Sequence, residues 1–405
     1  MTTSERALPP ELLAGVRQRL ALAGEHATSA SIAAAVRAER GSAVGSDAIQ
    51  RYASALHSEL VGAGPLQALV TDPAVTDVLV NGADGVWVDR GAGLRRTTLQ
   101  LDAATVRSLA QRLATACGRR LDDAMPYVDA RLPDGARLHA VLPPIATSGP
   151  YLCLRTFRRR GFTLDQLVTL GTVPEQVAPL LSAVVTARLP YLVTGGTGSG
   201  KTTLLATLLG LVPPDERIVM VEDAAELQPA HPHVVSLAAR AANAEGAGEV
   251  TLRELVRQAL RMRPDRIVVG ECRGGEIVEL LAALNTGHDG GAGTLHANSP
   301  TDVPARLEAL GLLGGLGREA LHAQVASALR VVIHLRRGAD GRKLREIRIL
   351  HSEPDGRVRA RCAWSARDGA GSAAPDLARL LVERGASSPA VLEPARAAVR
   401  ARCAT

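Results

Sequence analysis

The segment Gly195–Thr203, which reads Gly-Gly-Thr-Gly-Ser-Gly-Lys-Thr-Thr, constrains the fold of this chain more than any other feature. An apolar segment, Leu189–Thr194, precedes it, and a helical run of leucines follows it until Gly210. This order matches the pattern G-x-x-x-x-G-K-[ST], in which a strand, a glycine-rich loop and a helix N-terminus surround a phosphate group. We therefore predict an α/β domain that carries a phosphate-binding loop.

The residues of this loop have separate predicted roles. The glycines let the backbone curl so that successive N–H groups point at the β-phosphate. We expect Lys201 to reach the β- and γ-phosphates and the hydroxyl of Thr202 to hold Mg²⁺, so the expected cofactors are ATP and Mg²⁺. The predicted nucleotide-binding residues of the loop are Gly195, Gly196, Thr197, Gly198, Ser199, Gly200, Lys201, Thr202 and Thr203.

A phosphate-binding loop alone does not name a reaction, because kinases, GTPases, transporters and helicases share it. The N-K-x-D motif of a GTPase is absent, since the one lysine besides Lys201 is Lys343, preceded by Gly341 and Arg342. The LSGGQ-like signature of a transporter cassette is also absent. The sequence therefore favours a RecA-like ATPase.

Two further apolar segments end in carboxylates. Arg217–Val221 is followed by Glu222 and Asp223, and Ile267–Gly270 is followed by Glu271. The carboxyl ends of strands in an open α/β sheet form its ligand site. We expect Glu222 and Glu271 to divide two tasks, polarising the attacking water and steadying Mg²⁺ through water, because phosphoryl transfer depends on positioning and charge. The alternative is that both are solvated loop acids.

Polar residues are dense between His288 and Asn298, directly after an expected helix over residues 275–285. This density suggests a sensor of the γ-phosphate that uses His288 and His296. The alternative is that a histidine here is a satisfied core residue.

A capping-box pattern, Thr251–Glu254, begins a helix that precedes Ile267–Gly270. Its three arginines, Arg253, Arg257 and Arg261, fit either a solvated stripe or a contact with another subunit or a phosphate.

The predicted fold class is α/β, a RecA-like P-loop NTPase domain preceded by a smaller α+β domain and a helical lead-in. Turn signals at Asn81-Gly82 and Pro133-Asp134-Gly135 predict two hairpins in the smaller domain, and the basic segment Arg158–Gly161 is the expected linker. The expected organisation is a helical segment over 1–61, the α+β domain over 62–160, the ATPase domain over 161–350, and a hairpin with a tail over 351–405.

Composition narrows the class of protein further. The chain is 46% hydrophobic and 22% charged, and neither an apolar run of about 18 residues nor a signal-peptide pattern is evident, so we expect a cytoplasmic protein. The five cysteines form no C-x-x-C pair, which gives no sign of a zinc module. The net charge of +6 is almost entirely arginine, and the aromatic residues amount to 2%, so we expect no stable nucleic-acid binding.

Four of these segments together resemble the type II/type IV secretion ATPase family, most closely its CpaF/TadA-like tight-adherence (Flp-type) pilus and conjugation-associated branch. They are similar to the family's Walker A loop, Asp box, Walker B segment and His box, which correspond to Gly195–Thr203, Arg217–Leu227, Leu260–Glu271 and Asn285–Pro300. The resemblance covers roughly residues 60–350. The zinc-binding cysteine module of many type II members is absent, which argues against that branch.

The resemblance implies a homo-hexameric ring, with ATP held between the two domains of one subunit. Arginines of the α+β domain would reach the phosphates, and Arg131, Arg137 and Arg155 are the candidates. The implied catalytic residues are Glu271, Glu222, Lys201, His288 and His296, with Thr202 on Mg²⁺ and Glu222 or Glu271 in its shell through water.

The implied function is a cytoplasmic hexameric ATPase motor that hydrolyses ATP to power Flp-type pilus assembly or type II/IV secretion. It would associate peripherally with the inner face of the cell membrane through platform proteins. The competing expectation is a DNA-directed conjugation or translocation motor.

Overall fold

The structure, a computed structural model, separates the chain into two compact units, Met1–Arg158 and Arg159–Thr405. Of the expected linker, Arg158 to Arg160 lie outside the described residues. The residues that the structure describes are 9–23, 27–40, 45–91, 93–132, 135–156, 161–240, 242 and 247–393.

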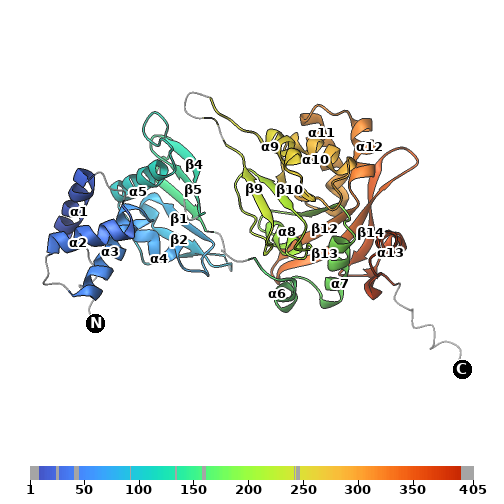
Figure 1. Ribbon diagram of the computed structural model, residues 1–405, viewed down its shortest axis with the longest axis horizontal. Helices are drawn as coiled ribbons and strands as arrows, with labels where there is room; N and C mark the ends of the chain where they lie inside the picture. The colour runs from blue at the N-terminus through green and yellow to red at the C-terminus, as the bar shows by residue number, and fades with distance from the viewer. Residues whose placement is uncertain are drawn as a thin grey trace, which may run out of the picture. The chain divides into compact units, whose positions relative to one another are not determined.

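Three helices begin the first unit (Figure 1), and they are α1 (Pro10–Ala23), α2 (Ser29–Arg40) and α3 (Ser46–Leu60). Apolar residues three or four positions apart, such as Ile32 and Val36, lie on one face of a helix. These faces pack together around a small core of their own that includes the buried side chains of Val16, Ile32 and Leu56. The predicted helical lead-in therefore forms a three-helix cluster, after which the short helix α4 (Gln67–Val70) leads into a sheet.

The rest of the first unit is a six-stranded antiparallel sheet in the order β3-β2-β1-β6-β5-β4. Its strands are β1 (Asp77–Asn81), β2 (Val86–Asp89), β3 (Leu94–Arg96), β4 (Tyr127–Arg131), β5 (Arg137–Val141) and β6 (Tyr151–Arg155). Both predicted hairpins are confirmed, since β1 pairs with β2 and β4 pairs with β5. Helix α5 (Ala103–Ala116) is capped by Asp102, whose Oδ1 accepts the Thr105 N–H at 2.7 Å, and its apolar face joins the core of the sheet.

The second unit is built on a nine-stranded sheet in the order β15-β14-β13-β12-β7-β11-β10-β8-β9. Its strands are β7 (Tyr191–Gly195), β8 (Ile218–Glu222), β9 (Val234–Ala238), β10 (Arg266–Cys272), β11 (Ala292–His296), β12 (Val331–Gly338), β13 (Gly341–Ser352), β14 (Val358–Ser365) and β15 (Gly369–Ala370). The strands from β12 to β9 in this order are parallel, whereas β13 to β15 are antiparallel. The parallel strands define a carboxyl-terminal edge, where Gly195 and His296 lie side by side, and an amino-terminal edge, where Tyr191 and Ala292 do.

Helices cover both faces of this sheet (Figure 1) and enclose a separate apolar core on each face. One face carries α6 (Leu164–Thr169), α7 (Ala178–Thr186), α8 (Lys201–Leu209) and α13 (Ala374–Glu383). The other carries α9 (Leu252–Ala259), α10 (Glu276–Asn285), α11 (Val303–Leu313) and α12 (Arg318–Ala328). Strands buried on both faces read as unbroken apolar runs, which is why β7 and β8 are buried at every position. The second unit is thus a RecA-like α/β domain.

Two features differ from the sequence-based expectation. Residue 351, where a separate hairpin was expected to begin, lies inside β13, which pairs with β12 on one side and β14 on the other. The turn at Asp355-Gly356 returns β14 to the same sheet, so residues 351–370 extend this domain. The polar segment after α10 also contains a strand, β11, which lies in the middle of the parallel part of the sheet.

None of the helices in the described part of the chain is both long and apolar enough to cross a membrane.

Candidate nucleotide-binding site

The glycine-rich loop leaves the carboxyl-terminal edge of the sheet at the end of β7. Gly195 has φ +150°, and a Cβ atom added there would lie 2.4 Å from the carbonyl oxygen of Leu335 and 2.6 Å from Oγ of Ser199. Gly200 caps α8 in the left-handed conformation, with φ +97°. No side chain fits at the first position, and the second favours glycine strongly. The backbone conformation of the loop therefore requires glycine at position 195 and favours it at position 200.

Lys201 begins α8, and its side chain turns back into the loop, where it is only 7% exposed. Its Nζ donates to the carbonyl oxygen of Gly196 at 3.1 Å, and the backbone N–H of Ser199 donates to the same oxygen at 3.3 Å. Burial lowers the pKa of Lys201, and the nearby Glu271 carboxylate offsets part of that shift. Donors from the loop and the lysine thus converge on one point, as the binding of a phosphate oxygen requires.

His296 connects the loop to the acidic strand β10. It is the last residue of β11 and pairs with Gly195, which brings both of its ring nitrogens to 3.4 Å from Nζ of Lys201. Its Nε2 lies 2.5 Å from Oε1 of Glu271. Burial, followed by the charge of Lys201, lowers the pKa of His296, although Glu271 opposes the shift. Lys201, His296 and Glu271 therefore form a continuous chain of contacts.

A β-bulge places Glu271 in this chain. Strand β10 has one more residue than β11 between the pairs Val269–Gly293 and Cys272–Leu295, so its course shifts at Gly270 and Glu271. Bulges re-aim side chains and recur beside active sites.

Arg273 is a member of the site that the sequence-based predictions missed. Its Nη2 donates to Oε2 of Glu271 at 2.5 Å, and its Nη1 lies 3.7 Å from Oδ2 of Asp223. It therefore bridges the ends of β8 and β10. The available signal was a basic residue two positions after a predicted strand-end carboxylate, because alternate residues of a strand lie on the same face.

Glu222 is buried, with 3% of its surface exposed, at the end of β8. Its Oε1 accepts the backbone N–H groups of Glu226 and Leu227, both at 2.9 Å. A Cβ atom at Gly270 would lie 2.6 Å from Cγ of Glu222, so this side chain packs against β10 at the residue before Glu271. Both predicted carboxylates have hydrogen-bond or ion-pair partners, so neither is a freely solvated loop acid.

His288 does not join this site within the chain. It precedes β11, and its Nδ1 lies 3.1 Å from the carbonyl oxygen of Ala283 at the end of α10. The five residues of β11, at about 3.3 Å each, separate this edge of the sheet from the loop. The sequence-based prediction assigned His288 and His296 to one sensor of the γ-phosphate, and in this structure only His296 lies at the loop. The two histidines lie at opposite ends of one strand.

The three predicted phosphate-binding arginines form a row in the first unit. Arg131 is directly opposite Arg137 in the β4–β5 pair, and Arg137 is directly opposite Arg155 in the β5–β6 pair. Arg137 binds Asp129 with Nη2–Oδ2 at 2.7 Å, and Arg155 binds Asp77 with Nε–Oδ1 at 3.0 Å. Directly opposed residues share one face of a sheet, and like charges in that position are destabilising. This concentration of positive charge suits an anionic ligand.

Two of the three arginines near α9 have a structural explanation. Arg253 and Arg257 both bind Oε1 of the buried Glu279, at 2.6 and 2.8 Å. They therefore fasten α9 to α10, while their side chains remain 41% and 55% exposed to solvent.

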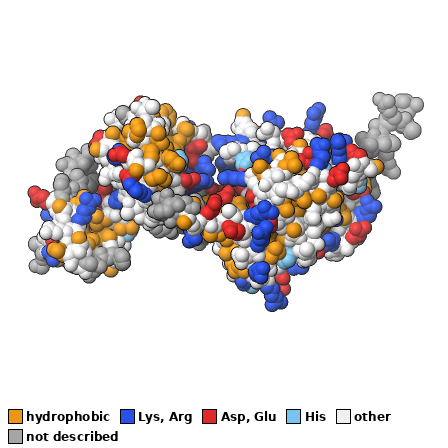
Figure 2. Space-filling model, turned by 90° about the horizontal axis from the view of Figure 1, so that it is seen from above, with side chains coloured by type: hydrophobic (Ala, Val, Ile, Leu, Met, Phe, Trp, Pro, Cys, Tyr) orange, Lys and Arg blue, Asp and Glu red, His pale blue; other side chains and the backbone are white. Residues whose placement is uncertain are grey.

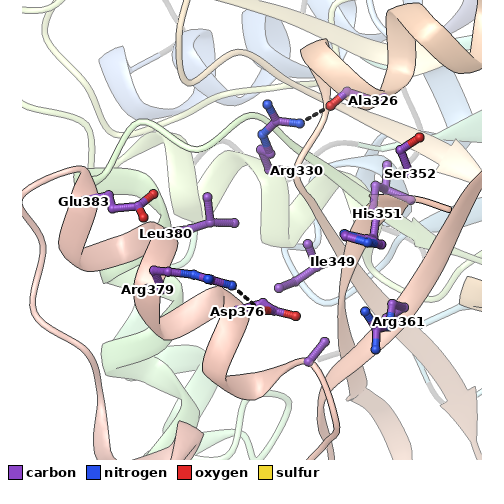
Figure 3. A pocket seen from close by; sticks show the side chains of 12 residues that line it. Ala326, Arg330, Ile349, His351, Ser352, Arg361, Asp376, Arg379, Leu380 and Glu383 are labelled. Carbon is purple, nitrogen blue, oxygen red and sulfur yellow. Dashed lines mark hydrogen bonds and ion pairs between the residues drawn. The ribbon is translucent and has the colours of Figure 1, made fainter. Parts of the chain in front are cut away.

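A cavity of about 430 Å³ lies away from the loop, among α12, β13, β14 and α13 (Figure 3). Its lining includes Arg330, which directly precedes β12, and Ser352, the last residue of β13. Because β12 begins and β13 ends at the amino-terminal edge, this cavity belongs to the edge opposite the candidate site.

The surface charge is mixed on the face that Figure 2 shows, where Lys and Arg side chains stand beside Asp and Glu side chains. Among the described residues, no three His, Cys, Asp or Glu side chains gather into a cluster that could hold a metal ion by themselves.

The RecA-like domain and the contact chain at its glycine-rich loop define the class of protein, a P-loop nucleotide-binding protein. The chain belongs to the family described as "Type II/IV secretion system protein", whose sequence profile matches residues 59–370.

Curated relatives agree with this assignment. The chain is 57% identical over 340 residues to the "Putative conjugal transfer protein" of Mycobacterium tuberculosis, covering 82% of this chain and 96% of the relative. It is 32% identical to the conjugal transfer protein TrbB of Rhizobium radiobacter, over 70% of this chain and 85% of the relative. It is 34% identical to the type IV secretion system protein PtlH of Bordetella pertussis, over 69% of this chain and 91% of the relative.

Solved structures support the fold. The pilus retraction motor PilT with bound ADP has a TM-score of 0.51 at 21% identity, over 71% of this chain and 83% of that one. The ATPase DotB of Yersinia pseudotuberculosis also has a TM-score of 0.51, at 18% identity, over 72% of this chain and 78% of that one.

Proposed function

We propose that this protein hydrolyses ATP and couples hydrolysis to mechanical work in a pilus-assembly or secretion machine. The observation that carries the proposal is the contact chain from Gly196 through Lys201, His296 and Glu271 to Arg273. Membership of the type II/IV secretion system family adds the mechanical role.

Within this proposal, Lys201 binds the β- and γ-phosphates and stabilises the charge that develops during phosphoryl transfer. Glu271 orients and polarises the attacking water, and Arg273 and His296 fix the position of its carboxylate. His296 contacts both Lys201 and Glu271, so it is placed to sense whether the γ-phosphate is present.

The donor set fits Mg²⁺, which prefers hydroxyl and carboxylate oxygens and keeps several waters. The hydroxyl of the half-buried Thr202 and, through water, the carboxylate of Glu222 or Glu271 would hold it. When bound with ATP, the ion neutralises charge on the transferred phosphoryl group.

The arginine row Arg131, Arg137 and Arg155 would supply positive charge from the first unit when ATP binds. The row supports this role because, among the described residues, it gathers three guanidinium groups against two partner carboxylates, Asp129 and Asp77, and so keeps a net positive charge.

The machine we propose is a homo-hexamer in the cytoplasm, bound to the inner face of the cell membrane through platform proteins of a Flp-type pilus or a type II/IV secretion system. A second candidate is a DNA-directed conjugation motor, which is favoured by the conjugal-transfer names of two relatives. ATPase activity stimulated by DNA in a salt-dependent manner would favour the second, and no effect of DNA would favour the first.

A phosphate-release assay on three purified variants tests the catalytic proposal. Lys201→Ala should lower turnover by about 10²- to 10³-fold, since a charge partner of the transition state is lost. Glu271→Gln should keep ATP binding and stop hydrolysis. Lys343→Ala removes the other lysine, whose Nζ binds the carbonyl oxygen of Gly171, and should hydrolyse ATP at the wild-type rate. Near-normal turnover by Lys201→Ala would refute the site, and loss of ATP binding in Glu271→Gln would make Glu271 structural.

A further inference from the structure

A hairpin from the far end of the domain lies against the phosphate-binding loop. Strands β12 and β13 pair Arg337 with Arg342 directly before the turn between Gly338 and Gly341. Nε of Arg342 donates to the carbonyl oxygen of Gly198 at 2.9 Å, across 144 residues of sequence.

The closeness of this packing is visible at the glycines of the loop. A Cβ atom at Gly198 would lie 3.2 Å from Nη1 of Arg337, and one at Gly200 would lie 3.3 Å from Cδ of Arg342. Both arginines are exposed at this surface. The two arginines therefore border the loop directly and remain open to solvent.

The neighbouring basic pair of the hairpin points the other way. Arg336 is directly opposite Lys343, one position along each strand, and successive side chains of a strand alternate between faces. Nζ of Lys343 accordingly donates to the carbonyl oxygen of Gly171, near the end of α6, at 2.8 Å. The hairpin thus presents one basic pair to the loop and an adjacent basic pair to the opposite face.

The hydrogen bond to Gly198 has a consequence for the loop's donors. In a planar trans peptide, the C=O and the following N–H point in opposite directions. Because Arg342 holds the Gly198 carbonyl on the outside, the Ser199 N–H points inward, where it donates to Gly196 at 3.3 Å beside Nζ of Lys201. Arg342 therefore orients one of the N–H groups that a phosphate would use.

The positive charges of Arg337 and Arg342 also favour an anion at the loop. Directly opposed like charges are destabilising, and among the described residues no carboxylate forms an ion pair with Arg337. An anion at the loop would lower the energy of this arrangement.

We propose that Arg337 and Arg342 are polyphosphate-binding residues of the nucleotide site, with Arg342 positioning the loop through Gly198 and Arg337 adding charge at its rim. The proposal deepens the proposed ATPase function and rests on it. It predicts that the hairpin recognises the phosphate chain of the nucleotide rather than the base.

The test measures dissociation constants for ATP and for inorganic tripolyphosphate by calorimetry in the full-length protein. Arg342→Gln should weaken both about tenfold, or about 1.4 kcal/mol, and Arg337→Gln should weaken both by about threefold. Arg336→Gln removes the same charge from the opposite face of the same hairpin and should stay within twofold of wild type. Arg342→Lys restores the charge but not the planar Nε donor, and should recover only part of the affinity.

The outcomes separate this inference from the proposed function. If the wild type binds neither ATP nor tripolyphosphate, the proposed function fails. If the wild type binds both and Arg337→Gln and Arg342→Gln bind as tightly as Arg336→Gln, only the hairpin inference fails. Affinity lost for ATP but kept for tripolyphosphate would also overturn it. Matching urea midpoints for the four variants would show that altered binding does not come from unfolding.

Discussion

The two edges of the nine-stranded sheet carry charged clusters of opposite character. At the amino-terminal edge, the side chain of Arg266 is 1% exposed, and its Nε donates to Oε2 of Glu216 at 2.7 Å. Arg188 binds the same carboxylate at 3.0 Å. At the carboxyl-terminal edge, Lys201 lies against His296, and the acid beside them, Glu271, is shared with Arg273.

The pKa shifts distinguish a structural cluster from a binding one. Burial raises the pKa of Glu216, but hydrogen bonds from Arg266 and Arg188 outweigh it and hold that pKa below its usual range. The same contact raises the pKa of Arg188, so Glu216 and its arginine partners stabilise one another's charged forms. Burial lowers the pKa values of both Lys201 and His296 and, for the histidine, the nearby lysine adds to the effect. Lys201 is therefore a buried cation held at a cost, which suits this edge to receive an anion.

The largest expected effect on stability is at the amino-terminal edge, in the cluster around Glu216. Glu216→Gln leaves Arg266 buried without its carboxylate and should lower the free energy of unfolding by about 3–5 kcal/mol, the cost of breaking a buried ion pair from one side. Urea unfolding measures it. Asp340→Asn serves as the control, because its pair with Arg345 is exposed and should contribute less than about 1 kcal/mol. A loss below about 1 kcal/mol for Glu216→Gln would remove the contrast between the two edges.

Urea unfolding of a variant at the carboxyl-terminal edge should show no loss of stability. Lys201→Met keeps the length of the side chain and removes a buried charge, so we expect a free energy of unfolding equal to wild type or higher by up to about 1 kcal/mol. Nucleotide binding should be lost in the same variant. A destabilisation comparable to that of Glu216→Gln would instead make Lys201 a structural residue.

The smallest expected effect is on the pH dependence of stability. A histidine whose pKa is lowered by folding takes up a proton more readily when unfolded, so its contribution to stability is lost as pH falls below about 6.5. His296→Asn should therefore lose less stability than wild type between pH 7.5 and 5.5, by less than about 1 kcal/mol because its side chain is partly exposed.

The charged groups around His296 are Lys201, Glu271, Arg273 and Arg306, and all four remain in that variant. Burial also lowers the pKa of His334, which contributes equally to the pH dependence of wild type and variant. Glu216 affects the pH dependence of stability in a separate, more acidic pH range. Its lowered pKa means that its contribution is lost only as pH falls below about 4.5. Equal acid sensitivity of wild type and His296→Asn above pH 5.5 would contradict the assignment.

Local sequence patterns predicted much of this molecule. The glycine-rich loop, the strands that end in Glu222 and Glu271, and the Asp102 helix cap follow from periodicity and turn chemistry within a few residues. The separation of His288 from His296 was not anticipated because β11 was not recognised in the sequence, and this strand lies between the two histidines.

What sequence could not supply were contacts between distant segments. Arg342 reaches the loop only because β12 pairs beside β7, a consequence of sheet topology that no local pattern encodes. The contact of Arg273 with Glu271 is local in sequence, whereas its contact with Asp223 depends on the order of neighbouring strands.

The pairing of His296 with Gly195 limits how the protein could transmit a signal. Both residues end central parallel strands that are buried between two apolar cores, so sliding one strand by a single residue would break its hydrogen-bond register and force both cores to repack. Strands β7 and β11 must therefore move together as one rigid body. Under the proposed function, a conformational change driven by the nucleotide would then consist of side-chain rotation at the carboxyl-terminal edge of the sheet or of movement at hinges outside these strands.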